Sequence, residues 1–220
     1  MENKVLEVYN LLLSTFKEQG WWPRFNKKEN KFVYDEGFKS SKPDKEEAFI
    51  ISLSAILAQN INWKNVEKSV INLNKENLLS KEALINVDIN KLAELIKHAG
   101  YFNQKAKKIK KFLEFNKELS RESLLEVWGI GDETADSILL YAYNFPIFVI
   151  DAYTKRIFNR IGFKLKSYKE FQELFHKYLP KDYKLFNEYH ALLVELAKKN
   201  CKKIPICDNC PLNKVCKKLI

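Results

Sequence analysis

Four cysteines lie close together near the end of the chain, at Cys201, Cys207, Cys210 and Cys216, and no other cysteine occurs among the 220 residues. Their spacing is C-x5-C-x2-C-x5-C. Four thiolates so close in sequence can surround one metal centre, either a structural Zn²⁺ or a four-iron cluster. The spacing therefore predicts a metal site and leaves both metals open.

A second group of residues suited to chemistry is the glycine pair Gly129 and Gly131, which is followed by an apolar run at residues 138–143. Two glycines separated by one residue permit a tight turn whose backbone amides point outward at the start of a helix. Such amides bind phosphate without a cationic side chain. The pair alone is more often typical of an ordinary turn between helices, so its context has to decide.

The elements that must position these residues are predicted to be helices. Apolar residues recur at helical spacing from Val5 to Phe16, and this first helix is expected to end at Gly20. Residues 26–45 are polar and are interpreted as a loop, whereas residues 46–57 fit a largely buried helix. Ser and Asp are favoured helix caps. Further helices are therefore expected to start at Ser80, Asp88, Ser120 and Asp151.

Composition supports a mostly helical protein with a polyanionic partner. Glycine and proline contribute 6 residues each, too few for the many turns of an all-β sandwich. One short apolar run, residues 145–150, is either a strand or a buried connector. The 38 basic and 28 acidic residues give a net charge of +10 and a pI near 9.2. This excess favours nucleic acid as the partner, with an anionic membrane surface second.

The sequence predicts neither a membrane span nor a secretory leader. Its longest stretch without a charged residue, residues 48–63, falls short of the roughly 20 apolar residues that a span needs. The first residues are charged and offer no apolar region with a cleavage site. A cytoplasmic protein is therefore expected, in a reducing compartment where clustered cysteines bind metal more readily than they form disulfides.

In combination these features resemble the helix-hairpin-helix DNA glycosylases of the endonuclease III type. The glycine hairpin, the apolar run, Asp151 twenty residues after Gly131 and the four-cysteine loop occur in the order found in that family. The resemblance extends over about residues 21–216. It implies an all-α, two-lobed helix-hairpin-helix fold with a C-terminal iron-sulfur loop.

The resemblance also implies how the chain is divided. A central helical domain is expected at residues 46–150, and a second lobe is expected from an N-terminal segment at residues 1–45 and a C-terminal segment at residues 151–220. The lesion pocket would lie between the two. At the cysteines the resemblance implies a [4Fe-4S] cluster, so iron is expected in preference to zinc.

Several site residues follow from the same resemblance. Gln59 and Asn60 match residues that enter the duplex near the lesion, Tyr101 matches a wedge, and Asp151 matches the catalytic aspartate. Lys105 opens a run of lysines that is either a solvated face or a stripe facing phosphates. The residues further expected to contact DNA are Asn103, Lys105, Gly129, Gly131 and Thr134.

One position departs from the bifunctional members of the family. Glu133 stands where those members carry a lysine that attacks the sugar as a Schiff-base nucleophile, and a carboxylate cannot form an imine. The sequence G-I-G-D-E-T-A-D is closer to the monofunctional branch that includes 3-methyladenine DNA glycosylases. In that branch two tryptophans and a further aromatic residue line the base pocket, which implies Trp21, Trp22 and Phe49 here.

The chemistry of base removal gives Asp151 a role beside that of a cap. Breaking an N-glycosidic bond builds positive charge on the deoxyribose, which a carboxylate stabilises while it orients or deprotonates water. An alkylated purine is already cationic, so it leaves readily and suits an aromatic box. We expect a monofunctional glycosylase that acts as a monomer and flips a damaged base out of double-stranded DNA.

Two alternatives remain open. The first is a bifunctional glycosylase and abasic-site lyase that uses another lysine, for instance Lys155. The second is a noncatalytic DNA-binding module held together by an iron-sulfur centre. His98, His176 and His190 are scattered and are interpreted as surface or packed residues, and not as catalysts.

Overall fold

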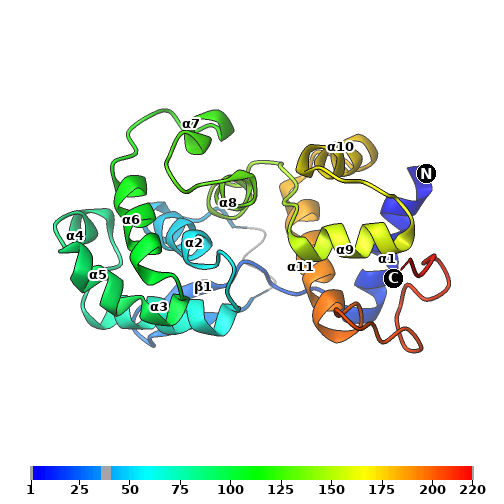
Figure 1. The fold of residues 1–220 in the computed structure, drawn as a ribbon, viewed down its shortest axis with the longest axis horizontal. Coiled ribbons are helices and arrows are strands. Elements are labelled where there is room, and N and C mark those ends of the chain that lie inside the picture. Colours follow the sequence, from blue (N-terminus) through cyan, green and yellow to red (C-terminus); the bar gives the residue numbers. More distant parts are fainter. Residues whose placement is uncertain (1, 36–40, 220) are drawn as a thin grey trace. The chain divides into compact units, whose positions relative to one another are not determined.

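The computed structural model describes residues 2–35 and 41–219 of the chain. The described residues fall into two compact units, whose elements Figure 1 colours along the sequence. The central unit consists of residues 22–34 and 41–144. The terminal unit combines the residues up to Trp21 with Asp35 and the residues from Phe145 onward.

The terminal unit is helical in its described part. Its helices are α1 (Glu2–Phe16), α9 (Ala152–Ile161), α10 (Tyr168–Tyr178) and α11 (Tyr183–Lys199). Helix α1 packs against α10 and α11, and α9 packs against α11. Tyr189 of α11 is fully buried, and its hydroxyl donates to the carbonyl of Val5 at 2.7 Å. The rings of Tyr9 and Phe175 both contact the ring of Tyr189, so an aromatic core joins helices from both ends of the chain.

The central unit consists of short helices around one buried helix, α2 (Lys45–Leu57). Helix α2 contacts α6, α8, η3 and the small sheet, and nearly all of its second half is buried. A helix that is apolar all round is typical of such a central position. The other helices of this unit are α3 (Trp63–Lys75), α4 (Lys81–Ile85), α5 (Ile89–Leu95), η2 (Lys97–Ala99), α6 (Phe102–Leu113), α7 (Arg121–Leu125), α8 (Asp132–Ser137) and the π-helix η3 (Ile138–Ala142).

The predicted helix starts are confirmed. Ser80, Asp88, Ser120 and Asp151 each accept a hydrogen bond from a backbone amide in the first turn of the following helix. The buried helix expected at residues 46–57 is also confirmed and begins one residue earlier. These signals could be read from the sequence because a cap and its helix are adjacent in the chain.

The prediction of a loop over residues 26–45 is wrong at its start. Strand β1 (Arg24–Asn26) pairs antiparallel with β2 (Lys31–Val33), and a turn at Asn30, with φ 51°, connects them. The rings of Phe25 and Phe32 meet across the pair at 5.0 Å between centroids. These two aromatic residues hold a hairpin together among polar neighbours. Residues 36–40 of the same segment lie outside the described residues.

Two further expectations are settled by the structure. Helix α1 ends at Phe16, not at Gly20, because Lys17 already takes a left-handed φ of 61°. Residues 145–150 form a connector and not a strand. The backbone amide of Phe148 donates to His176 Nε2 at 3.0 Å, so the buried second half of this connector uses a side chain as a hydrogen-bond partner.

Candidate functional site

The glycine pair lies in a hairpin between α7 and α8 of the central unit. Gly129 has φ 86°, and a Cβ atom there would lie 2.4 Å from Cγ of Lys108. Gly131 has an ordinary φ of −102° at the N-cap of α8, and a Cβ atom there would meet no other atom within 4 Å. The first glycine is therefore required by the fold, whereas the second leaves open space at the start of the helix.

Arg121 fixes the two helices of the hairpin relative to each other. From the first turn of α7 its Nε donates to Oδ1 of Asp136 at 2.7 Å, and an amino group donates to Oδ1 of Asp132 at 2.5 Å. Asp136 is fully buried, and a buried carboxylate needs such a partner. Sequence reasoning missed this pair, although an aspartate beside an apolar run was a usable signal.

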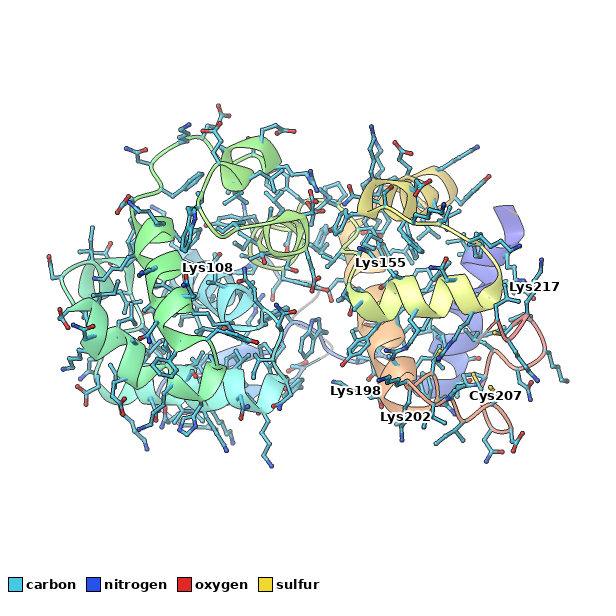
Figure 2. All side chains as sticks on the ribbon, in the orientation of Figure 1. Lys108, Lys155, Lys198, Lys202, Cys207 and Lys217 are labelled. Atoms are coloured by element: carbon cyan, nitrogen blue, oxygen red, sulfur yellow. The ribbon has the colours of Figure 1, made fainter. Side chains whose placement is uncertain are left out.

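Gln59 joins the turn after α2 to the same hairpin. Its Nε2 donates to the carbonyl of Gly129 at 3.0 Å and to Oγ1 of Thr134 at 2.9 Å. Its Oε1 accepts from Nζ of Lys108, which Figure 2 labels. The structure thus brings together three residues that were each expected to contact DNA. Thr134 is buried, so its side chain supports the hairpin instead of facing outward.

The remaining predicted DNA-contacting residues of the central unit, apart from Lys105, are exposed. Asn60 has φ 55° and lies in the turn after α2. Tyr101 has φ 45° and is 76% exposed, more than other large apolar or aromatic residues in the described part of this unit. Asn103 is exposed in the first turn of α6. An aromatic side chain held outward by a left-handed backbone is suited to contact a partner.

The prediction that the lysine run faces phosphates or solvent is wrong for Lys105. This side chain is 2% exposed, and its ammonium donates to the carbonyls of Leu57 and Ala99. Burial lowers the pKa of Lys105 to about 8, and the nearby charge of Lys108 acts in the same direction. Lys110 also donates to two backbone carbonyls, and Lys111 pairs with Glu114. The run is therefore largely used within the protein.

The three aromatic residues expected to line a base pocket have different surroundings. Trp22 is 8% exposed, and its ring meets Trp63 edge-on at 5.0 Å and Tyr141 at 4.8 Å. Phe49 of α2 is half-buried. Trp21 is half-buried in the terminal unit. Trp22 thus contributes to an aromatic core, and the pocket role of the three residues stays a prediction.

Asp151 lies at the start of α9 in the terminal unit. Its Oδ1 accepts from the amide of Thr154 at 2.7 Å, while Oδ2 lies 3.8 Å from Nε2 of His190. The carboxylate is 13% exposed and the imidazole 9%. Burial lowers the pKa of His190, and the charge of Asp151 opposes that shift. His190 was interpreted as a packed residue. Its position beside Asp151 depends on packing between α9 and α11, which no local pattern shows.

The residues that bear on a Schiff-base step lie in separate units. Glu133 is exposed in the first turn of α8 in the central unit. Lys155 lies one turn after Asp151 on α9, and its Nζ is 5.6 Å from the centre of the Tyr168 ring. Figure 2 labels Lys155. Within the terminal unit Lys155 is thus a lysine one helical turn from the predicted catalytic aspartate.

The four cysteines are free thiols and line one cavity after α11. Among the described residues, no three His, Cys, Asp or Glu side chains converge so as to hold a metal ion. Burial raises the pKa of the Cys210 thiol, and the other three cysteines add to that effect. Figure 2 labels Cys207 in this loop, together with Lys202 and Lys217.

Two arginines of α9 attach the cysteine loop to the rest of the terminal unit. Arg156 donates to the carbonyl of Cys201 at 2.9 Å. Arg160 donates to the carbonyls of Lys202 and Lys203, and one of its amino groups lies 3.4 Å from Sγ of Cys201. Sequence reasoning missed both residues. Their spacing of four on a helix was the available signal, because such residues share one face.

The described helices include none that is long and apolar enough to cross a membrane.

Comparison with protein families gives a match over residues 53–181 to the family described as HhH-GPD superfamily base excision DNA repair protein. A protein of Methanocaldococcus jannaschii, named as a DNA repair glycosylase, is 40% identical over 98% of each chain.

Two solved structures are similar to this chain. The 3-methyladenine DNA glycosylase of H. pylori, bound to 1,N6-ethenoadenine, is 26% identical with a TM-score of 0.65. The match covers 74% of this chain and 92% of that one. A non-covalent endonuclease III–DNA complex has a TM-score of 0.79 over 99% of this chain and 96% of that one. At 19% identity the second likeness concerns the fold alone.

Proposed function

We propose a specific reaction for this chain, which belongs to the HhH-GPD superfamily of base excision DNA repair proteins and is a DNA repair glycosylase of that family. In this proposal it removes alkylated purines from double-stranded DNA without cutting the strand. Water, and not a lysine, would replace the base. The observation that carries this proposal is the position of the Asp151 carboxylate, with one oxygen fixed by a helix amide and the other beside a buried histidine.

Asp151 is proposed to act on the sugar. As the C1′–N bond breaks, its electron pair leaves with the base and positive charge develops on the deoxyribose. A carboxylate near C1′ stabilises that charge and accepts a proton from the water that forms the new C1′–O bond. The hydrogen bond from Thr154 to Oδ1 holds the side chain in place, so that little reorganisation is needed during the reaction.

The identity of residue 133 supports a monofunctional reaction. Glu133 occupies the place of the nucleophilic lysine, and a carboxylate cannot form an imine. Lys155 supports the second candidate function, a bifunctional lyase, because it lies one turn from Asp151 on the same helix. Its ammonium lies 5.6 Å from the centre of the Tyr168 ring, so it already makes a contact within the terminal unit. We therefore favour water as the nucleophile.

The substrate class rests on two considerations. The H. pylori relative is a 3-methyladenine DNA glycosylase with 1,N6-ethenoadenine bound. Aromatic side chains attract a cationic purine more strongly than a neutral base, and Trp21, Trp22 and Phe49 are the proposed residues. Trp21 and Phe49 are half-buried, which leaves part of each ring for a ligand. Because Trp22 is packed against Trp63 and Tyr141, it would offer only an edge.

A [4Fe-4S] cluster is proposed at the four cysteines. The four cysteines line one cavity, and four cysteine thiolates are a usual ligand set for such a cluster. The choice of iron over zinc rests on the resemblance to the endonuclease III type. Arg160, beside Sγ of Cys201, would offset part of the negative charge of the thiolates. Cys201, Cys207, Cys210 and Cys216 would hold the cluster, which would fix the loop and its lysines for contact with phosphates. We also propose a monomer in a reducing, cytoplasmic setting, where clustered cysteines bind metal more readily than they form disulfides.

The test is single-turnover base release from duplexes that carry 3-methyladenine, 1,N6-ethenoadenine or an oxidised pyrimidine. We expect release of the alkylated purines and an abasic strand that breaks only after alkali. Efficient cross-linking to DNA in the presence of borohydride would instead support the lyase. If the purified protein binds duplex DNA and releases no base from any substrate, the noncatalytic module would replace both.

A further inference from the structure

One buried ammonium connects two carbonyl groups in the central unit. Nζ of Lys105 donates to the carbonyl of Leu57 at 2.7 Å and to that of Ala99 at 2.6 Å. Leu57 is the last residue of α2, and Ala99 is the last residue of η2. Carbonyls at helix ends lack partners within the helix and carry partial negative charge. An ammonium is therefore a well-suited donor to both.

The two carbonyls directly precede the two turns that carry the residues expected, from the family resemblance, to enter the duplex. After Leu57 comes the turn with Gln59 and Asn60, and after Ala99 come Gly100 and Tyr101. Asn60, Gly100 and Tyr101 all have positive φ, so neither turn is held by regular helix geometry. The turns also approach each other, since a Cβ atom on Gly100 would lie 3.4 Å from Cδ1 of Ile61.

We propose that Lys105 is a positioning residue that holds these two turns in the conformation with which they open the duplex, a role that rests on the glycosylase function proposed above. Its side chain is 2% exposed, so water cannot easily replace the ammonium. Without the ammonium, two buried carbonyls would lose their donor, and each turn would be free to relax separately. Lys105 itself does not contact the substrate.

The same helix provides a matched control. Nζ of Lys110 donates to the carbonyls of Leu84 and Ile85 at 2.8 and 2.9 Å, at the end of α4. Lys110 thus has the same chemistry as Lys105, on the same helix α6, but serves a helix end away from the two turns. Lys105→Met and Lys110→Met each remove an ammonium and retain a similar length of side chain.

The experiment measures single-turnover excision from two duplexes, one with the lesion in a matched pair and one with it opposite a mismatch. A mismatched base is already less stably stacked and is easier to extrude. For Lys105→Met we expect the matched duplex to lose about ten- to a hundredfold in rate, and the mismatched duplex to lose much less. A 2-aminopurine beside the lesion should also brighten less on binding. Lys110→Met should retain the wild-type ratio of the two rates.

Outcomes for this role and for the enzymatic function are distinguishable. No base release by the wild-type protein would contradict the function. Activity in the wild type, with an unchanged ratio of rates in a folded Lys105→Met, would overturn the positioning role. If Lys105→Met does not fold, Gly100→Ala decides, because a side chain at φ 60° strains one of the same turns without touching the lysine. Gly100→Ala should reproduce the loss on the matched duplex, and an unchanged ratio there would likewise overturn the proposal.

Discussion

Asp151 combines a structural and a proposed chemical role in one side chain. Its Oδ1 caps α9 through Thr154, and its Oδ2 faces His190. The cap could be predicted from the sequence, because an aspartate before a helix is a local signal. The histidine could not, because it comes from α11 and reaches Asp151 only through packing of the terminal unit. The immediate surroundings of the proposed catalytic residue can thus be known only in part from sequence.

We expect Asp151→Asn to reduce excision by at least about a hundredfold while duplex affinity stays nearly unchanged, because the substitution removes charge and keeps shape. Asn is also a good helix cap, so the melting temperature should change little. Single-turnover excision and thermal unfolding on the same preparation would check this. Asp182→Asn is a matched control, since Asp182 is the side-chain cap of another helix of the same unit, α11. Excision at near wild-type rate by Asp151→Asn would contradict the assignment.

The buried ammonium of Lys105 should make the free energy of unfolding depend on pH. Burial lowers its pKa from an ordinary value of 10.5 to about 8 in the folded protein. Between these two values the unfolded chain binds more protons, so the free energy of unfolding should increase as the pH rises from about 8 to about 10. The gain should be about 2 to 4 kcal/mol at most, since one pKa unit corresponds to about 1.4 kcal/mol.

Urea unfolding of the wild type and of Lys105→Met at pH 7 and pH 9.5 would test this. The difference isolates Lys105, because buried tyrosines such as Tyr189, whose pKa is raised by burial, titrate alike in both proteins. The wild type should gain stability relative to the variant as the pH rises. A difference that stays constant, or changes in the other direction, would show that Lys105 does not titrate in this range.

At the scale of elements, the hairpin between α7 and α8 illustrates that two glycines in one motif are constrained differently. Gly129 combines a positive φ with the close approach of the Lys108 side chain, whereas Gly131 has ordinary backbone angles and open space. The motif could be predicted from the spacing. The contact with Lys108 could not, because it comes from α6, about twenty residues earlier in the chain.

We expect Gly129→Ala to lower stability by about 1 to 3 kcal/mol, because a side chain there is strained at φ 86° and meets Lys108. Gly131→Ala should leave stability within about 0.5 kcal/mol, as for a surface substitution. If the hairpin contacts phosphate, the added methyl group should nevertheless weaken duplex binding. Denaturant unfolding and a binding titration separate the two effects. Equal stability of the two variants would contradict the different roles of the glycines.

Local signals also explain which elements could be predicted. Caps and buried helices were found because their residues are neighbours in sequence. The β1–β2 hairpin was missed because Phe25 and Phe32 are single apolar residues among polar ones. Their rings contact each other only once the two strands pair, and this contact cannot be inferred from either residue alone. Lys105 was misplaced for a similar reason: a lysine is rarely buried, and its two partners lie on other elements.

At the scale of the whole molecule, the four cysteines allow the metal content of the purified protein to be predicted. We expect one four-iron cluster per chain, a brown protein with broad visible absorption, and loss of both iron and colour in Cys207→Ser. Ser14→Ala on α1 is a suitable control, since Ser14 lies outside the cysteine loop. Iron analysis and absorption after anaerobic purification would check this. A colourless protein with one zinc per chain would reverse the choice of metal.

The packing of α1 against α11 has a consequence for biosynthesis. The hydrogen bond from Tyr189 to Val5 spans 184 residues, so α1 is made long before its packing partners α10 and α11. The central unit consists of intervening residues and can acquire its contacts earlier. Until those helices are made, the apolar face of α1 stays exposed. Val5, Val8 and Leu12, fully buried in the finished protein, are the apolar side chains that α1 would present to a chaperone in this interval.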